Sequence, residues 1–173
     1  MIITPSSEFI RPANTTAYVA GDLVANSTTA AAVVPLCFNI EAFKKRSGVV
    51  GFVRLFKDDE TTTNANFSLH LFTKAPSVTA GDNAAIAIST SEYWFGTVAC
   101  DMSSGAFATS TDLISRFQTL HGSTPGLFAF DVHNNEVPKE LYGLLEAEAA
   151  YTPSSGERFK VWLEIGDDGG NSQ

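Results

Sequence analysis

Apolar and polar residues alternate along much of this chain, and a period of two residues is the pattern of a half-buried β-strand. The alternation is clearest over residues 66–73, where Phe67, Leu69 and Leu71 are predicted to point to one face and His70 to the other. Similar runs, bounded by turn-forming residues, predict further strands at residues 33–43, 49–57, 92–101, 126–132, 141–151 and 158–165.

Several segments are open to more than one interpretation. Residues 111–120 fit a helical face as well as a strand, and the neighbouring strands favour a strand. Residues 84–89 are compatible with a strand or a helical turn, and residues 144–150 have helical propensity inside a predicted strand. The turn signal Thr152-Pro-Ser-Ser-Gly-Glu157 separates the last two predicted strands, so we expect a closing β-hairpin there.

The predicted strand 49–57 is apolar on both faces. Valine and leucine residues share one face, whereas Phe52, Arg54 and Phe56 share the other. A strand of this kind lies in the middle of a sandwich or packs against a partner.

Short strands separated by turns, without an internal repeat or a linker, predict an all-β fold: a single-domain antiparallel β-sandwich, jelly-roll-like, with an N-terminal arm. Pro5 and Pro12 bracket the first short run, so residues 1–13 are predicted to form this arm. Such an arm pairs with the body or reaches a neighbouring molecule. Residues 14–165 are predicted to form the sandwich, and residues 166–173 an acidic flexible tail.

Composition restricts the classes of function. The chain has 173 residues and a formal net charge of −8, and 17% of its residues are charged. The acidic balance argues against nucleic-acid binding, because phosphate contacts need Lys and Arg, and against docking on an anionic membrane. No run approaches the roughly 20 apolar residues of a membrane span, and the N-terminus has no signal-peptide pattern.

No arrangement of residues in the sequence predicts catalysis, a cofactor or a metal site. His70 would need a hydrogen-bonding partner to act as a base, and the sequence names none. Asp131 and His133 share a predicted strand face, but no third metal ligand is identifiable. Cys37 and Cys100 lie in apolar runs, which favours two reduced core thiols and leaves a single disulfide as the alternative.

Distinctive runs extend over nearly the whole chain. They are Arg11-Pro-Ala-Asn-Thr-Thr-Ala-Tyr-Val-Ala-Gly-Asp-Leu-Val-Ala-Asn-Ser-Thr-Thr-Ala30, Val34-Pro-Leu36, Asn64-Ala-Asn-Phe-Ser-Leu-His-Leu-Phe72, Ala75-Pro76, Gly81-Asp-Asn-Ala84, Leu141-Tyr-Gly-Leu-Leu-Glu-Ala147 and Tyr151-Thr-Pro-Ser-Ser-Gly-Glu157. These runs resemble a family of small virion-associated proteins encoded by tailed phages and prophages. The basic turn Lys44-Lys-Arg46 and the acidic tail depart from that family's pattern.

The resemblance implies a capsid decoration (cement) protein without enzymatic activity or cofactor, which binds the phage major capsid protein on the outer head surface. It also implies a β domain that acts as a homotrimer, is made in the host bacterial cytoplasm and is located on the capsid exterior of the virion. The expected assembly interface combines residues of the arm and of strand 49–57: Phe9, Ile10, Arg11, Phe52, Arg54 and Phe56.

The alternative function is a receptor- or glycan-binding β module of a phage head or tail fibre. It depends on the consecutive aromatic residues Tyr93, Trp94 and Phe95, whose rings are suited to stacking on a sugar. In a strand that is apolar on both faces, the same residues also serve as core and interface.

Overall fold

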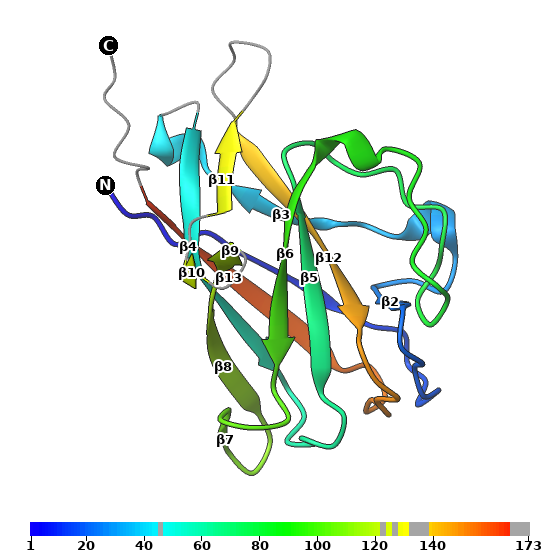
Figure 1. The fold of residues 1–173 in the computed structure, drawn as a ribbon. Coiled ribbons are helices and arrows are strands. Elements are labelled where there is room, and N and C mark those ends of the chain that lie inside the picture. Colours follow the sequence, from blue (N-terminus) through cyan, green and yellow to red (C-terminus); the bar gives the residue numbers. More distant parts are fainter. Residues whose placement is uncertain (45–46, 122–123, 126–127, 132–138, 167–173) are drawn as a thin grey trace.

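The computed structural model describes residues 1–44, 47–121, 124–125, 128–131 and 139–166. These residues form two main antiparallel sheets that pack face to face (Figure 1). The β-sandwich predicted from the sequence is therefore confirmed.

The six-stranded sheet contains β1 (Ser6–Ile10), β4 (Ser47–Lys57), β7 (Phe107–Ala108), β8 (Leu113–Gln118), β11 (Phe128–Asp131) and β13 (Arg158–Gly166). The five-stranded sheet contains β2 (Asp22–Val24), β3 (Leu36–Asn39), β5 (Asn66–Phe72), β6 (Trp94–Asp101) and β12 (Glu140–Ala147). Two short strands, β9 (Leu120–His121) and β10 (Thr124–Pro125), pair separately, and three 3-10 turns occupy Ala30–Ala32, Glu41–Phe43 and Ser91–Tyr93.

The strand order is that of a jelly roll. The first sheet runs β1-β13-β4-β8-β7, with β11 also paired to β4, and the second runs β2-β12-β5-β6, with β3 also paired to β12. Counted along the chain with β2 and β3 as one, the long strands are β1, β2/β3, β4, β5, β6, β8, β12 and β13. Each successive strand in this series changes sheet except β5 and β6, which are neighbours in the five-stranded sheet, and the order is that of two interlocked Greek keys.

The core fills the space between the sheets, and β13 shows how the sequence pattern builds it. Phe159, Val161, Leu163 and Ile165 point inward and have no exposed surface, whereas the alternate residues of the strand are half-buried. Each fully buried side chain of this size contributes about 1.5–3 kcal/mol relative to exposure. The period-two pattern thus gives one dry face and one face that meets water.

The prediction of a closing β-hairpin is wrong, although both of its strands are present. Strand β12 belongs to the five-stranded sheet, between β2 and β3 on one edge and β5 on the other. Strand β13 belongs to the six-stranded sheet, between β1 and β4. Because both edges of each strand are already paired, the turn 152–157 passes from one sheet to the other. The strand prediction for residues 111–120 is confirmed by β8. In the segment 144–150, residues 144–147 pair as part of β12 and residues 148–150 follow it without a helix.

The N-terminal segment runs along the sandwich as an edge strand. Strand β1 pairs with β13 over five residue pairs, and Ile3 forms an isolated bridge with Ile165. Of the two outcomes expected for an arm, the structure has the one in which it pairs with the body.

A long loop, residues 73–93, lies over the outer face of the five-stranded sheet (green, Figure 1). Beneath it Leu23, Phe72 and Leu144 form a second apolar cluster with Ile86 and Ile88 of the loop. Within the stretch 84–89, left open between strand and helical turn, the chain makes isolated β-bridges instead of a regular element.

Candidate functional site

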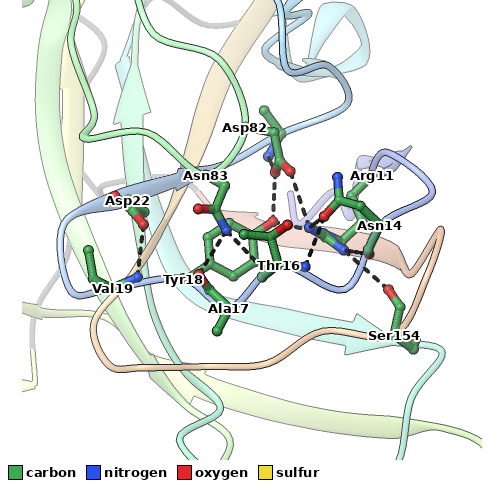
Figure 2. A network of polar contacts seen from close by, with 11 residues as sticks. Arg11, Asn14, Thr16, Ala17, Tyr18, Val19, Asp22, Asp82, Asn83 and Ser154 are labelled. Carbon is green, nitrogen blue, oxygen red and sulfur yellow. Dashed lines mark hydrogen bonds and ion pairs between the residues drawn. The ribbon is translucent and has the colours of Figure 1, made fainter.

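A buried ion pair joins two of the distinctive sequence runs, 11–30 and 81–84 (Figure 2). The Arg11 guanidinium lies 3.2 Å from the Asp82 carboxylate, and neither side chain is exposed. Tyr18 completes the set, because its hydroxyl donates to Asp82 at 2.6 Å and accepts from Arg11 Nε at 2.7 Å. Desolvation, followed by the contacts with Asp82, raises the pKa of Tyr18 far above its usual value. The neutral phenol therefore persists as a donor.

Further contacts tie this network to neighbouring loops, as the dashed lines of Figure 2 indicate. Arg11 Nη1 donates to the backbone carbonyls of Asn14 and Ser154, and Asn83 Nδ2 donates to the carbonyls of Thr16 and Ala17. These residues come from three of the runs that carry the family resemblance. The side chains of Arg11, Tyr18 and Asp82 thus bond to one another and to neighbouring loops, and the cluster is a structural anchor.

A second buried network lies beside the first. Lys57 Nζ, whose side chain has no exposed surface, donates to the Tyr151 hydroxyl at 3.0 Å and lies 3.3 Å from Glu157 Oε1. Burial raises the pKa of Glu157, and its Oε2 has no hydrogen-bond partner among the described residues. The Tyr18 and Tyr151 rings stack with centroids 6.4 Å apart, which joins the two networks.

The outer face of the six-stranded sheet is the first candidate interaction surface. Aromatic and charged side chains alternate across three adjacent strands, and we call this surface the aromatic–basic face: Phe52, Arg54, Phe56, Arg116, Arg158, Lys160, Trp162 and Glu164. The register brings Arg54 opposite both Trp162 and Arg116. All three strands are antiparallel neighbours, so the face is continuous.

Cations stack on the rings of this face. The Arg116 guanidinium carbon lies 3.4 Å from the Phe52 ring centroid, and Arg54 lies 5.3 Å from that of Trp162. Lys160 also lies over Trp162, at 5.1 Å, and Arg158 over Phe56, at 5.3 Å. Such contacts contribute about 0.5–1 kcal/mol each at exposed sites. They also hold long side chains in place before any partner arrives.

Glu164 is the acidic centre of the face. Its two oxygens accept from Arg116 Nε at 2.8 Å and Nη2 at 2.7 Å, and Arg54 lies 3.7 Å away. The Arg116 hydrogen bonds lower the pKa of Glu164. At the margins Glu8 and Asp58 approach Lys160 and Arg158, so four cations meet three carboxylates, a local charge of +1 in a chain of −8.

Four of the six residues expected at the assembly interface lie on or beside this face. Phe52, Arg54 and Phe56 are half-buried on it, and Ile10 is exposed on β1 opposite Arg158. The other two point inward. Phe9 stacks on the core residue Phe159 with centroids 5.6 Å apart, and Arg11 is buried in the anchor network. The structure therefore corrects the expectation for Arg11, which is buried, whereas alternation along β1 turns Phe9 toward the sandwich and leaves it half-buried.

A cavity of about 190 Å³ on the outer face of the five-stranded sheet is the second candidate. Its apolar and polar lining residues are Phe72, Ile86, Ile88, Trp94, His70, Ser91 and Glu146. The three expected aromatic residues separate here: Trp94 is exposed at the cavity, Phe95 packs toward the core, and Tyr93 lies beneath the Lys74 ammonium.

His70 has the partners that the sequence could not name. Its Nε2 lies 2.5 Å from Glu146 Oε2, and its Nδ1 lies 2.7 Å from the Thr97 hydroxyl. The pairing of β5 with β6 places Thr97 directly opposite His70, while Glu146 lies diagonally across on β12. Sequence separations of 76 and 27 residues hide both contacts from any local pattern.

The cysteines are both free thiols, but they differ in exposure. Cys100 is buried as expected, whereas Cys37 is exposed, so the prediction of two core thiols is wrong for Cys37. Alternation explains the difference, because Leu36 and Phe38 occupy the inward positions of β3.

Within the described ranges, no three His, Cys, Asp or Glu side chains converge as a metal site. His133 and the acidic tail from residue 167 lie outside the described residues, and only the backbone of Asp131 is described. No helix in the described part of the chain is long and apolar enough to cross a membrane. A scan of protein-family models and a search of curated proteins find no match to this chain.

Proposed function

We propose that the chain is a structural protein of a tailed-phage virion, a capsid decoration protein that binds the outer head surface and bridges major capsid protein subunits. The observation that carries this proposal is the aromatic–basic face, where Arg and Trp, both enriched in interface hot spots, lie on a rigid sheet. The sequence resemblance supports it, and so does the fold by analogy, because jelly rolls recur in viral capsid domains.

The charge of the face indicates the kind of capsid surface that it fits. Its cations carry a local excess of positive charge within an acidic protein, so an acidic patch on the major capsid protein is the complementary partner. Arg54 and Arg116 are already oriented by Glu164, which reduces the side-chain entropy lost on docking. The remaining acidic surface disfavours binding to DNA.

Assembly as a homotrimer would strengthen such docking. Several protomers held together bind several capsid subunits at once, so each contact after the first is intramolecular and modest contacts hold firmly. The protein then acts by adding buried contact area between subunits and not by chemistry.

Co-sedimentation with emptied phage heads that lack this protein tests the proposal. Wild-type protein should sediment with the heads, and Arg54→Glu should not, because it places a carboxylate beside Glu164 and removes one of the two cations that lie over Trp162. Val19→Ser is the matched control, since Val19 is exposed outside the aromatic–basic face. Circular dichroism checks that all three proteins are folded. Equal binding of Arg54→Glu and wild type, or no binding by any of them, contradicts the proposal.

A glycan-binding module of a head or tail fibre is the second candidate function. The observation that favours it is the exposed indole of Trp94 beside a cavity with polar groups. A glycan-array signal that Trp94→Ala abolishes and Arg54→Glu leaves unchanged would favour this candidate over the decoration protein.

A further inference from the structure

The cavity beside Trp94 combines features that select a ligand. Trp94 is 52% exposed, although burial of such a ring is favourable, and its indole N–H donates to the Thr97 hydroxyl at 3.2 Å. The hydrogen bond fixes the ring as a platform at the cavity. Phe72, Ile86 and Ile88 provide further apolar walls.

Polar groups reach the same cavity from two neighbouring strands. A carboxylate only accepts hydrogen bonds, so the His70 Nε2–H donates to Glu146, and Thr97 holds the other side of the ring. The Glu146 carboxylate has further acceptor capacity, and Ser91 adds a hydroxyl that both donates and accepts. Side chains locked on paired strands form a pre-organised site.

These features match one chemical class. A sugar ring has C–H faces, which are attracted to the negative face of an aromatic ring, and hydroxyl groups at its edge, which donate to a carboxylate. A cavity of about 150 Å³ accommodates benzene, so about 190 Å³ holds one six-membered ring. An anion would be repelled by the Glu146 carboxylate, and a purely apolar ligand would leave the remaining acceptor capacity of Glu146 unused and away from water.

We propose that this cavity binds one neutral six-membered sugar ring, stacked on Trp94 and hydrogen-bonded to Glu146. The cavity lies on the outer face of the five-stranded sheet, and the aromatic–basic face lies on the opposite side of the sandwich. A protein docked through the aromatic–basic face would therefore turn the sugar site away from the head. That orientation rests on the proposed function, whereas sugar binding itself does not.

Nuclear magnetic resonance of the full chain tests the site directly. The sequence has two tryptophans, so the spectrum has two indole N–H signals, and Trp162→Phe assigns them. Titration with the neutral methyl glycosides of glucose, galactose, mannose and N-acetylglucosamine should shift the Trp94 signal saturably with at least one of them. The Trp162 signal, on the other sheet, should stay in place.

Two variants locate the binding. Trp94→Ala should weaken glycoside binding about tenfold or more, as expected for a stacking contact, and Glu146→Gln should weaken it while leaving the shape of the cavity. Calorimetry measures both, and Trp162→Phe should bind like wild type.

The proposal is overturned if no neutral glycoside gives a saturable Trp94 shift, or if both indole signals move together. A saturable shift with methylguanidinium or with a uronic acid alone also overturns it, because the ligand class would then be ionic. Capsid binding by Trp94→Ala is measured separately. The proposed function predicts that it is unchanged, because Trp94 lies outside the aromatic–basic face, so sugar binding and capsid binding can fail independently.

Discussion

The Arg11 guanidinium and the Asp82 carboxylate lie 3.2 Å apart with both side chains fully buried, although 71 residues separate them in the chain. The pair links the end of the edge strand β1 to the loop that covers the five-stranded sheet. Tyr18 bonds to both partners, so three segments meet at one ionic centre.

Removal of one partner of this pair should destabilise the protein strongly. Asp82→Ala leaves the Arg11 charge buried without compensation, and we expect the free energy of unfolding to fall by about 3–5 kcal/mol in urea titrations. Arg116→Ala is the control, because its ion pair with Glu164 is exposed and contributes at most about 1 kcal/mol. Similar losses in the two variants would contradict the anchoring role of Arg11 and Asp82.

The local strand pattern could be predicted from the sequence because it depends on neighbours in the chain. Alternation in β5 and β13 identifies which residues are inward, and the expected strands are present. The pairing between strands depends on residues that are far apart in the chain, so the local pattern does not predict it. Two strands joined by a short turn suggest a hairpin, but the turn 152–157 crosses between sheets because both strands find other partners.

Prediction of the candidate sites has the same limit, because contacts between distant residues leave no local pattern. The sequence places Phe52, Arg54 and Phe56 together because they share a face of one strand, and whether they contact a partner stays a prediction. The sequence predicts Arg11 at an interface, whereas partners distant in the chain, Asp82 and Ser154, help to satisfy its charge in the interior. The partners of His70 likewise come from other strands, so the cavity had no sequence signal beyond Trp94.

The backbone at Gly81 lies so close to the backbone of Thr28 that no side chain should fit there. A Cβ there would lie 2.0 Å from the Thr28 carbonyl oxygen, so the loop beside Asp82 must move in Gly81→Ala. We expect a loss of about 2 kcal/mol or more, which lowers the melting temperature by about 4–8 °C for a domain of this size. In Gly51→Ala the nearest atom is 3.9 Å away, and calorimetry should show a much smaller change.

The exposed Cys37 and the buried Cys100 should differ in reactivity. A maleimide should modify one thiol in the native protein and two after unfolding, as read by mass spectrometry. Burial raises the pKa of both thiols, so native labelling should be slow at neutral pH and faster at alkaline pH. Cys37→Ser should remove native labelling completely. An intramolecular disulfide would contradict this prediction.

The ion pair on the aromatic–basic face should make stability depend on pH. The pKa of Glu164 is lowered in the folded protein, so its contribution is present above the unfolded value of about 4.5 and is lost as the pH falls. The difference in unfolding free energy between wild type and Glu164→Gln should therefore shrink on acidification. In an Arg116→Ala background the same difference should vary much less with pH.

Electron cryomicroscopy of the virion tests the central claim most directly. We predict density for this protein on the exterior of the head, with the strands that carry Arg54 and Trp162 against the major capsid protein and Trp94 facing outward. Density only in the tail, or on the head with the aromatic–basic face toward solvent, would contradict it.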